Sequence, residues 1–207
     1  MNTENYVLKE RALKSLQGKW GLAIGVSLIY LLILGAFNTA PHYFGSIPTL
    51  IITGPMLFGY TLFNLAIARN QETSIDLLFK GFNRFGISLA AYLIMLLFVV
   101  LWMILLIIPG IIAALSYSMT FFIIADNQSI DAMDALKKSK DIMKGFKMKL
   151  FMLWLSFIGW AILSILTFGI GFLWLMPYAQ VSLSNFYDDI KIHKVVIPND
   201  QDTPEYI

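Results

Sequence analysis

Cysteine is absent from this chain of 207 residues, and histidine occurs only twice, as His42 and His193. Without a thiol the protein has no disulfide, no thiolate metal site and no cysteine nucleophile. Two histidines far apart in sequence also disfavour a histidine-rich metal site. We therefore expect no metal, no cofactor and no catalytic residue of these kinds.

Charge is absent from three long stretches, residues 20–68, 85–125 and 150–187, which contain no Asp, Glu, Lys or Arg. Charged residues make up 14% of the chain and apolar residues 58%, whereas soluble domains have about 25% and about 45–50%. Lipid is the common solvent that excludes charge so uniformly. The pattern therefore predicts an integral membrane protein.

Each uncharged stretch is too long for one membrane-spanning helix of about 20 residues and suits two. Turn-forming residues lie near the middle of each stretch: Pro41 and Pro48, then Pro109 and Gly110, then Gly169. We therefore predict an all-α, polytopic membrane helical bundle of six transmembrane helices arranged as three hairpins. The predicted helices are 20–37, 50–68, 86–108, 110–125, 150–168 and 171–187.

The basic residues predict which side of the membrane each segment faces. Lys and Arg number four in residues 1–19, three in 69–84, six in 126–149 and two in 188–207. None lies at a predicted hairpin tip. Since basic segments stay in the cytoplasm, an even number of crossings per stretch places both termini there. Four helices with re-entrant loops are the alternative, and they also keep all the charge on one side.

A threefold internal repeat is suggested by Gly18, Gly81 and Gly145, each of which precedes a hairpin. Repetition of one helical unit is a common way for membrane folds to grow. The predicted units are 5–68, 69–125 and 126–187, within a single membrane domain 1–197. Any three hairpins could look alike at this level, which is the simpler explanation. Residues 198–207 are predicted to be a flexible polar tail.

Amphipathic helices are predicted in the charged segments, most clearly at 129–145, with Ser129 as its N-cap. Such a helix could lie at the membrane interface, drawn to anionic lipid by its basic residues. The simpler interpretation is that this charge only sets the topology. The candidate lipid contacts are Lys137, Lys138, Lys140, Lys144, Lys147 and Lys149.

No predicted span contains an ionisable acid or base, which disfavours proton-coupled transport and intramembrane hydrolysis. The last span carries a polar group consisting of Gln180, Ser182, Ser184 and Asn185. These four side chains could line a path for a polar solute. More commonly such residues form hydrogen bonds between helices.

Sequence motifs for nucleotide binding, serine hydrolysis and zinc proteolysis are absent. Basic residues are not interleaved with stacking aromatic residues, so nucleic acid is not an expected partner. Gly21 and Gly25 form a G-x-x-x-G motif that permits close helix approach. An enzyme is therefore the least favoured of the functional classes.

The third unit contains a distinctive series that includes Ala135-Leu136-Lys137-Lys138-Ser139, Met143-Lys144-Gly145, Leu166-Thr167-Phe168-Gly169-Ile170-Gly171 and Asn185-Phe186-Tyr187. It resembles a family of bacterial integral membrane proteins of unknown function, found mainly in Firmicutes. The resemblance covers most of residues 5–191. It is also similar, more distantly, to the membrane domain of some glycerophosphodiester phosphodiesterases. The resemblance implies a bacterial cytoplasmic membrane protein and supplies no catalytic residues.

The sequence thus leads to a non-enzymatic membrane component as the first functional hypothesis. Its partners would be membrane lipids, and also a protein partner or a second copy of itself. The alternative is a small channel or permease component that moves a small solute or lipid, using the polar group in the last span.

Overall fold

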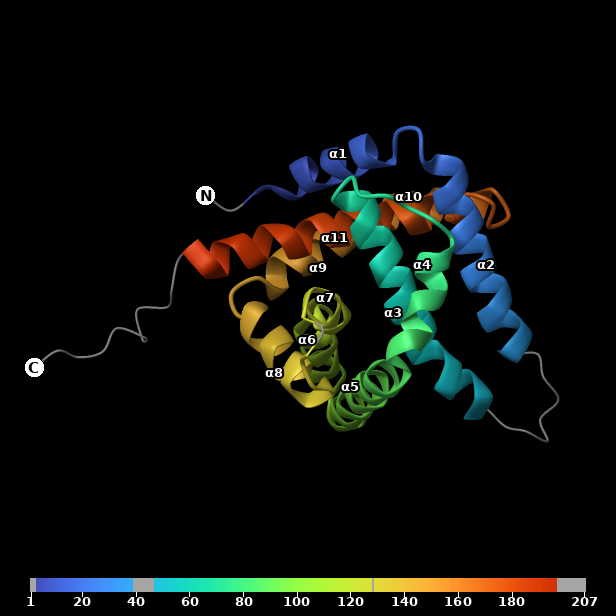
Figure 1. Ribbon diagram of the computed structural model, residues 1–207. Coiled ribbons are helices and arrows are strands. Elements are labelled where there is room, and N and C mark those ends of the chain that lie inside the picture. The colour runs from blue at the N-terminus through green and yellow to red at the C-terminus, as the bar shows by residue number, and fades with distance from the viewer. Residues whose placement is uncertain (1–2, 39–46, 128, 197–207) are drawn as a thin grey trace, which may run out of the picture.

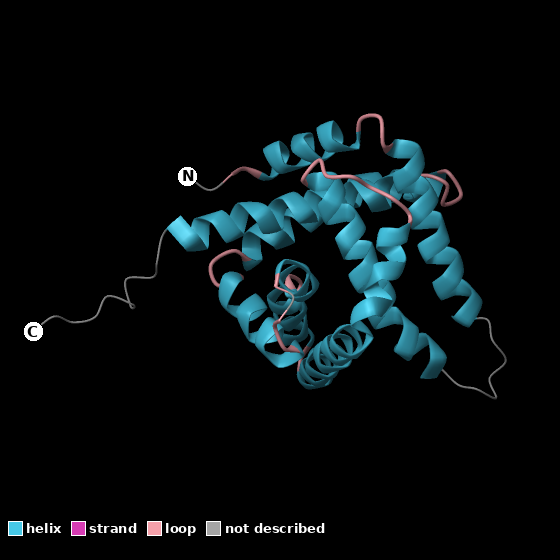
Figure 2. Cartoon of the chain, viewed as in Figure 1, coloured by secondary structure: helices cyan, strands magenta, loops and turns pink. Residues whose placement is uncertain are grey.

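The computed structural model describes residues 3–38, 47–127 and 129–196, and within these ranges the chain forms helices and no strand. Figure 2 shows these helices joined by short loops. The all-α prediction is confirmed for the described part of the chain. The tip of the first hairpin and the predicted tail lie outside the described residues.

Helices of very different lengths alternate along the chain, short in the charged segments and longer in the uncharged ones. In chain order they are α1 (Asn5–Leu16), α2 (Trp20–Asn38), α3 (Ile47–Ala68), α4 (Asp76–Phe79), the 3₁₀ helix η2 (Lys80–Arg84), α5 (Phe85–Leu105), α6 (Ile107–Tyr117), α7 (Thr120–Asp126), α8 (Ala132–Ile142), α9 (Lys147–Leu155), α10 (Ile158–Leu166) and α11 (Phe172–Val196).

The long helices form three antiparallel pairs, with α2 beside α3, α5 beside α6 and α7, and α9 and α10 leading into α11 (Figure 1). The second pair turns earlier than predicted. α5 ends at Leu105, Leu106 is extended, and Pro109 lies in the first turn of α6. Proline is compatible with a first helical turn, because its missing N–H has no partner there. Pro109 therefore starts a helix instead of ending one.

Four segments are long and apolar enough to cross a membrane: Ile47–Ala68, Asp76–Leu105, Ile107–Asp126 and Lys147–Leu166. A fifth is obtained if α1 and α2, which meet at a bend of 99°, count as one broken span. Among the described helices, α11 is not one of the segments that are long and apolar enough to cross a membrane. The structure thus supports a multi-pass membrane protein with four or five candidate spans, and six spans stay a prediction.

The three glycines that suggest the repeat, Gly18, Gly81 and Gly145, differ in their structural roles. Gly18 and Gly145 have φ angles of 75° and 85°, in the left-handed region that favours glycine. They join α1 to α2 and α8 to α9. Gly81 lies inside η2, where an added Cβ would come within 1.9 Å of the Pro55 carbonyl oxygen. Gly81 therefore allows close packing of η2 on α3 and is not a hinge.

Each short charged helix except α1 packs on the hairpin that precedes it in the chain. α4 and η2 pack on α3, and α8 packs on α5, α6 and α7. α1, which has no hairpin before it, packs along α11 at the other end of the chain. This order is compatible with a threefold repeat, which stays a prediction.

Helix α8 begins later than predicted. It starts at Ala132 with Asp131 at the N-cap position, while Ser129 forms hydrogen bonds with Asn127 in the preceding loop. The amphipathic pattern itself is present, since Ala135, Leu136 and Ser139 are buried and the lysines are exposed or half-buried.

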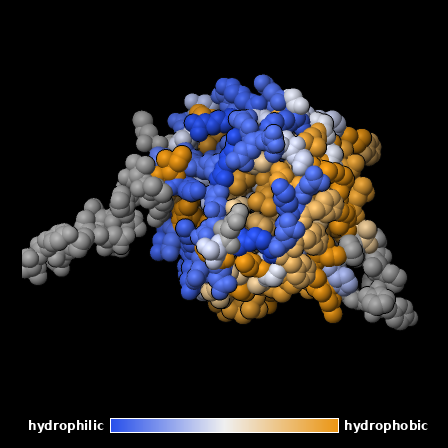
Figure 3. All heavy atoms as spheres, viewed as in Figure 1, coloured by the Kyte–Doolittle hydropathy of each residue, from blue (hydrophilic) through white to orange (hydrophobic). Residues whose placement is uncertain are grey.

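The centre of the molecule is α3, of whose apolar window 67% is buried, against 11% for the span that includes α5. The outer part of α5 exposes large apolar side chains such as Leu97 and Ile104. Figure 3 shows hydrophilic residues over the centre and upper part of one face, and hydrophobic residues along its right and lower sides. Such a wide apolar surface is suited to lipid contact.

Candidate functional site

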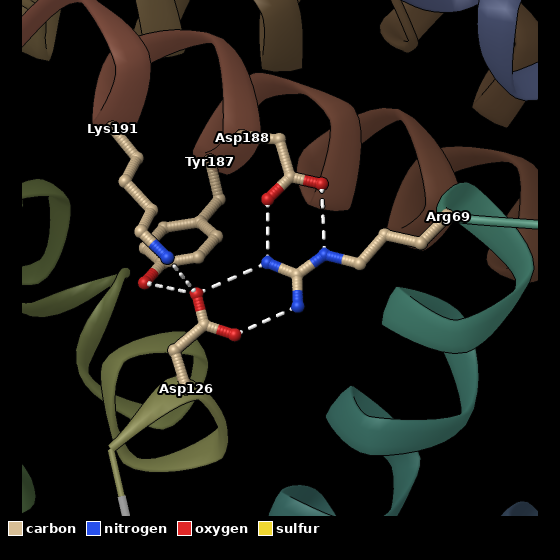
Figure 4. A network of polar contacts seen from close by, with 5 residues as sticks. All are labelled: Arg69, Asp126, Tyr187, Asp188 and Lys191. Atoms are coloured by element: carbon tan, nitrogen blue, oxygen red, sulfur yellow. Dashed lines mark hydrogen bonds and ion pairs between the residues drawn. The ribbon is translucent and has the colours of Figure 1, made fainter. Parts of the chain in front are cut away.

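Three hairpins end at one cluster of charged side chains. Arg69 directly follows α3, Asp126 ends α7, and Asp188 lies on α11 (Figure 4). Each is the first charged residue after one of the three uncharged stretches. Tyr187 and Lys191 of α11 complete this group of five residues, which we call the central ion cluster.

The geometry of the central ion cluster is that of a double clamp on one guanidinium. Arg69 donates to Asp126 with Nη–Oδ distances of 2.7 and 3.0 Å. It donates to Asp188 through Nε at 3.1 Å and Nη2 at 2.6 Å. Planar two-point pairing of this kind is specific to arginine. Asp126 also accepts from Tyr187 at 3.0 Å and from Lys191 at 2.6 Å.

Charge within the cluster is balanced, with two cations and two carboxylates. Hydrogen bonds to Asp188 and then to Asp126 raise the pKa of Arg69 above its ordinary value, although burial opposes this. Arginine therefore stays charged at any physiological pH. Every charge of the cluster is thus paired within the described structure, and removal of one partner would leave a partly buried charge uncompensated.

A second ion pair ties the two ends of the chain to α9. Lys149 lies 2.7 Å from Asp189, and their side chains are only 14% and 7% exposed. The Thr3 hydroxyl donates to Asp189, and Asn5 donates to the Lys149 carbonyl at 3.0 Å. Lys149 therefore has a structural role, which separates it from the other candidate lipid contacts.

The sequence alone did not identify these ion clusters. All five residues of the central ion cluster lie just outside or at the end of an uncharged stretch. The available signal was their position, because helices that return to one side of a membrane can bring the residues that follow them together. Nothing in the spacing specified which of the fifteen basic residues would pair with which acid.

The other five predicted lysines divide into two groups. Lys137 lies 3.3 Å from Asp134 and Lys144 lies 2.8 Å from Asp141, each within α8 or directly after it. Lys138, Lys140 and Lys147 have no ion pair with any residue in the described part of the chain. The predicted basic cluster is thus partly neutralised by neighbouring acids.

Lys140 and Lys147 line the same cavity, of about 200 Å³, whose walls come mainly from α6. Its other lining residues include Trp102, Ile112 and Tyr117. Ser139, beside Lys140, is fully buried and holds α8 against the end of α6. Its hydroxyl donates to the Ser116 carbonyl at 2.8 Å and accepts from the Met119 N–H at 3.2 Å.

The polar residues of α11 have separate surroundings. Ser182 and Ser184 are buried and donate to the carbonyls of Tyr178 and Gln180 within their own helix. The Asn185 amide contacts the Leu8 carbonyl of α1 at 3.5 Å. Gln180 itself lines a largely apolar cavity of about 340 Å³ with Trp154 and other residues. The structure thus places these four residues in three different environments.

Three tryptophans, Trp20, Trp160 and Trp174, line one apolar cavity of about 400 Å³, together with Leu13 and Tyr178. Trp20 begins α2, while Trp160 and Trp174 lie near the turn of the third hairpin. The turn of that hairpin therefore lies close to the junction between α1 and α2, and α1 is a charged helix.

Metal binding finds no support in the described ranges, which contain no group of three or more His, Asp or Glu residues able to hold an ion.

Comparison with protein families finds one match. Residues 96–194 match the model of DUF975, which is described as a protein of unknown function. The matched region runs from within α5 to within α11 and includes the predicted lysines and the polar residues of α11. It agrees with the expected likeness to a family of unknown function. Comparisons with curated proteins and with solved structures give no match.

Proposed function

We propose that this chain is a non-enzymatic component of a bacterial cytoplasmic membrane that binds anionic lipid at its charged face. The observation that carries the proposal is that Lys138, Lys140 and Lys147 have no acidic partner in the described structure. Lys140 and Lys147 also line a cavity beside the apolar second hairpin. Basic residues at a membrane surface attract anionic lipid by about 1 kcal/mol each.

The proposed topology places all four charged segments, and both termini, in the cytoplasm. Convergence of Arg69, Asp126 and Asp188 supports it, because the ends of three uncharged stretches meet at one place. If all three hairpins cross the membrane, the chain has six spans. The packing of each charged helix on the preceding hairpin supports a repeat of three such units.

The third hairpin favours the re-entrant alternative. α1 runs along α11, with Lys9 3.3 Å from Ser156 and Leu13 near Trp174 at the hairpin turn. Glu10 and Lys14 of α1 are 56% and 68% exposed. A full crossing would carry these charges toward the membrane centre, where charge is costly. We therefore expect this hairpin to turn back within the cytoplasmic leaflet.

Single-cysteine labelling tests the topology, since the chain has no native cysteine. Leu106→Cys and Phe168→Cys place probes at the second and third turns, and Glu72→Cys is the cytoplasmic control. A membrane-impermeant maleimide applied outside the cell should leave Glu72→Cys unlabelled, and inverted vesicles should label it. External labelling of Glu72→Cys would overturn the topology. External labelling of Phe168→Cys would show that the third hairpin crosses.

Lipid binding is tested by native mass spectrometry of the protein released from nanodiscs of phosphatidylglycerol and phosphatidylcholine. We expect phosphatidylglycerol to be retained in excess over its share of the bilayer. Equal retention of both lipids would contradict anionic lipid binding. A retained protein partner, or a second copy of the chain, would support binding through the helices instead.

A small channel or permease component is the weaker candidate. Gln180 lines a cavity, but Ser182 and Ser184 satisfy their hydroxyl groups within α11, so no continuous polar path is formed by these residues. Solute flux in proteoliposomes that falls on Gln180→Leu or Asn185→Leu would favour this candidate over lipid binding.

A further inference from the structure

The cavity lined by Lys140 and Lys147 joins two chemically different surfaces. Lys140 lies near the end of α8 and Lys147 begins α9, and Gly145 lies between these helices. The opposite wall, from α5 and α6, includes Trp102 and Ile112. The cavity, of about 200 Å³, is therefore lined by two cationic residues and by aromatic and aliphatic side chains.

Charge at this cavity is not balanced within the described structure. Lys137, Lys144 and Lys149 each have an acidic partner within 3.3 Å, whereas Lys140 and Lys147 have none within 4.0 Å. Lys140 and Lys147 both line the cavity, and an anion bound there would be attracted by both of their charges. The site is thus electrostatically complementary to an anionic ligand.

The apolar wall distinguishes between anions. A small inorganic anion would use the lysines and leave Trp102 and Ile112 unoccupied. Next to the wall, Leu105 and Ile108 at the turn of the hairpin are 67% and 72% exposed, so the apolar surface continues outward from the cavity. An acyl chain fits this continuous surface, and tryptophan is common where apolar and polar regions of a membrane meet.

We propose that this cavity is the binding site of one anionic phospholipid of the cytoplasmic leaflet. Its phosphate lies between Lys140 and Lys147, and an acyl chain follows the wall past Ile112. Because Trp102 and Pro109, beside the turn of the second hairpin, line the same cavity as Lys140 and Lys147, this site requires the second hairpin to turn back in that leaflet as well. This inference rests on the proposed function and assigns the lipid to one site with two of the six predicted lysines. The other four lysines take no part in this site.

A pair of charge-matched double variants tests the site. Lys140→Gln with Lys147→Gln removes the two unpaired lysines of the cavity, and Lys137→Gln with Lys144→Gln removes two lysines that are already paired with Asp134 and Asp141. Both variants lose two positive charges. In phosphatidylglycerol nanodiscs, native mass spectrometry should show about thirtyfold less retained lipid for the first, from about 1 kcal/mol for each of the two lysines. The second should stay close to the wild-type protein.

Ile112→Trp supplies an independent measurement that leaves every charge in place. The larger side chain fills the apolar part of the cavity, so retained phosphatidylglycerol should fall while far-UV circular dichroism stays unchanged. Added inorganic phosphate at millimolar concentration should not displace the lipid. Displacement by phosphate would show an anion site without a chain-binding wall, and would overturn the proposal.

The results of these experiments distinguish failure of this site from failure of the proposed function. If both double variants lose lipid equally, binding is spread over the basic surface, and the site is wrong while the proposed function stands. If the wild-type protein retains no excess of phosphatidylglycerol, the proposed function fails and this site fails with it.

Discussion

The guanidinium of Arg69 forms a two-point ion pair with the carboxylate of Asp126, with distances of 2.7 and 3.0 Å between nitrogen and oxygen. These residues are separated by more than fifty positions and end two different hairpins. Their side chains are 26% and 14% exposed, so the pair is only partly screened by water. The clamp therefore links the hairpins at their charged ends.

Replacement of Arg69 should destabilise the whole bundle. Arg69→Gln leaves Asp188 without its cation and Asp126 with Lys191 as its cation and Tyr187 as a neutral donor, in a region that is partly buried. Loss of one partner of a buried pair costs about 3–5 kcal/mol, and partial exposure reduces this to about 1–3 kcal/mol. Thermal unfolding in detergent should show a lower midpoint.

Two further substitutions serve as comparisons for Arg69→Gln. Arg69→Lys should lie between the wild type and Arg69→Gln, because lysine keeps the charge and loses the two-point geometry. Lys138→Gln removes an exposed charge without an ion pair in the described structure and should change the midpoint little. A stability of Arg69→Gln equal to that of Lys138→Gln would show that the clamp is not stabilising.

Gly59→Ala should disrupt the packing of α4 on α3. An added Cβ would lie 1.8 Å from the Leu78 carbonyl oxygen, a distance that requires the backbone to move. Overpacking typically costs about 1–3 kcal/mol, and a backbone obstacle places this site at the upper end. Gly25→Ala in α2 is the matched control, since no atom lies within 4 Å of its added Cβ. Equal expression and thermal stability of the two variants would contradict the packing.

Gly145→Ala tests the turn between α8 and α9. Its φ of 85° lies in the left-handed region, where an L-residue costs roughly 1–2 kcal/mol. Gly159→Ala, inside α10 with open space around it, should be neutral or slightly stabilising because alanine favours helix. Gly145→Asn should recover part of the loss, since asparagine tolerates this conformation. Equal unfolding midpoints for Gly145→Ala and Gly159→Ala would show that the turn is not strained.

Ser139→Ala should loosen α8 from the second hairpin. The substitution leaves the buried Met119 N–H without its acceptor and removes the hydrogen bond to the Ser116 carbonyl. An unsatisfied buried group costs about 1–3 kcal/mol. Ser182→Ala is the control, because its hydroxyl bonds only to the Tyr178 carbonyl of its own helix. Hydrogen exchange in α8 should quicken in Ser139→Ala alone.

Much of the architecture could be predicted from the absence of charge, because lipid constrains helix length and position strongly. The boundaries of α3 and the turn at Gly169 follow from apolar runs and turn residues. The turn at Leu106 was less predictable, since Pro109 can either end a helix or begin one. Local sequence does not decide between these two roles.

The candidate site was only partly predictable for a different reason. Six lysines within thirteen positions look equivalent in sequence, yet Lys149 is buried against Asp189, forty residues away. Lys140 and Lys147 differ from Lys137 and Lys144 only through the tertiary position of α6 and the nearby acids. Pairing of charges over long distances depends on how helices pack, which periodicity does not encode.

The contact between α1 and α11 has a consequence for the order in which the molecule is completed. α1 is synthesised before α11, so Leu8 can meet Asn185 only after α11 has been made. Before then α1 can pack on α3, with which it also makes contact. The contact between α1 and α11 is therefore one of the last tertiary contacts that the chain can form.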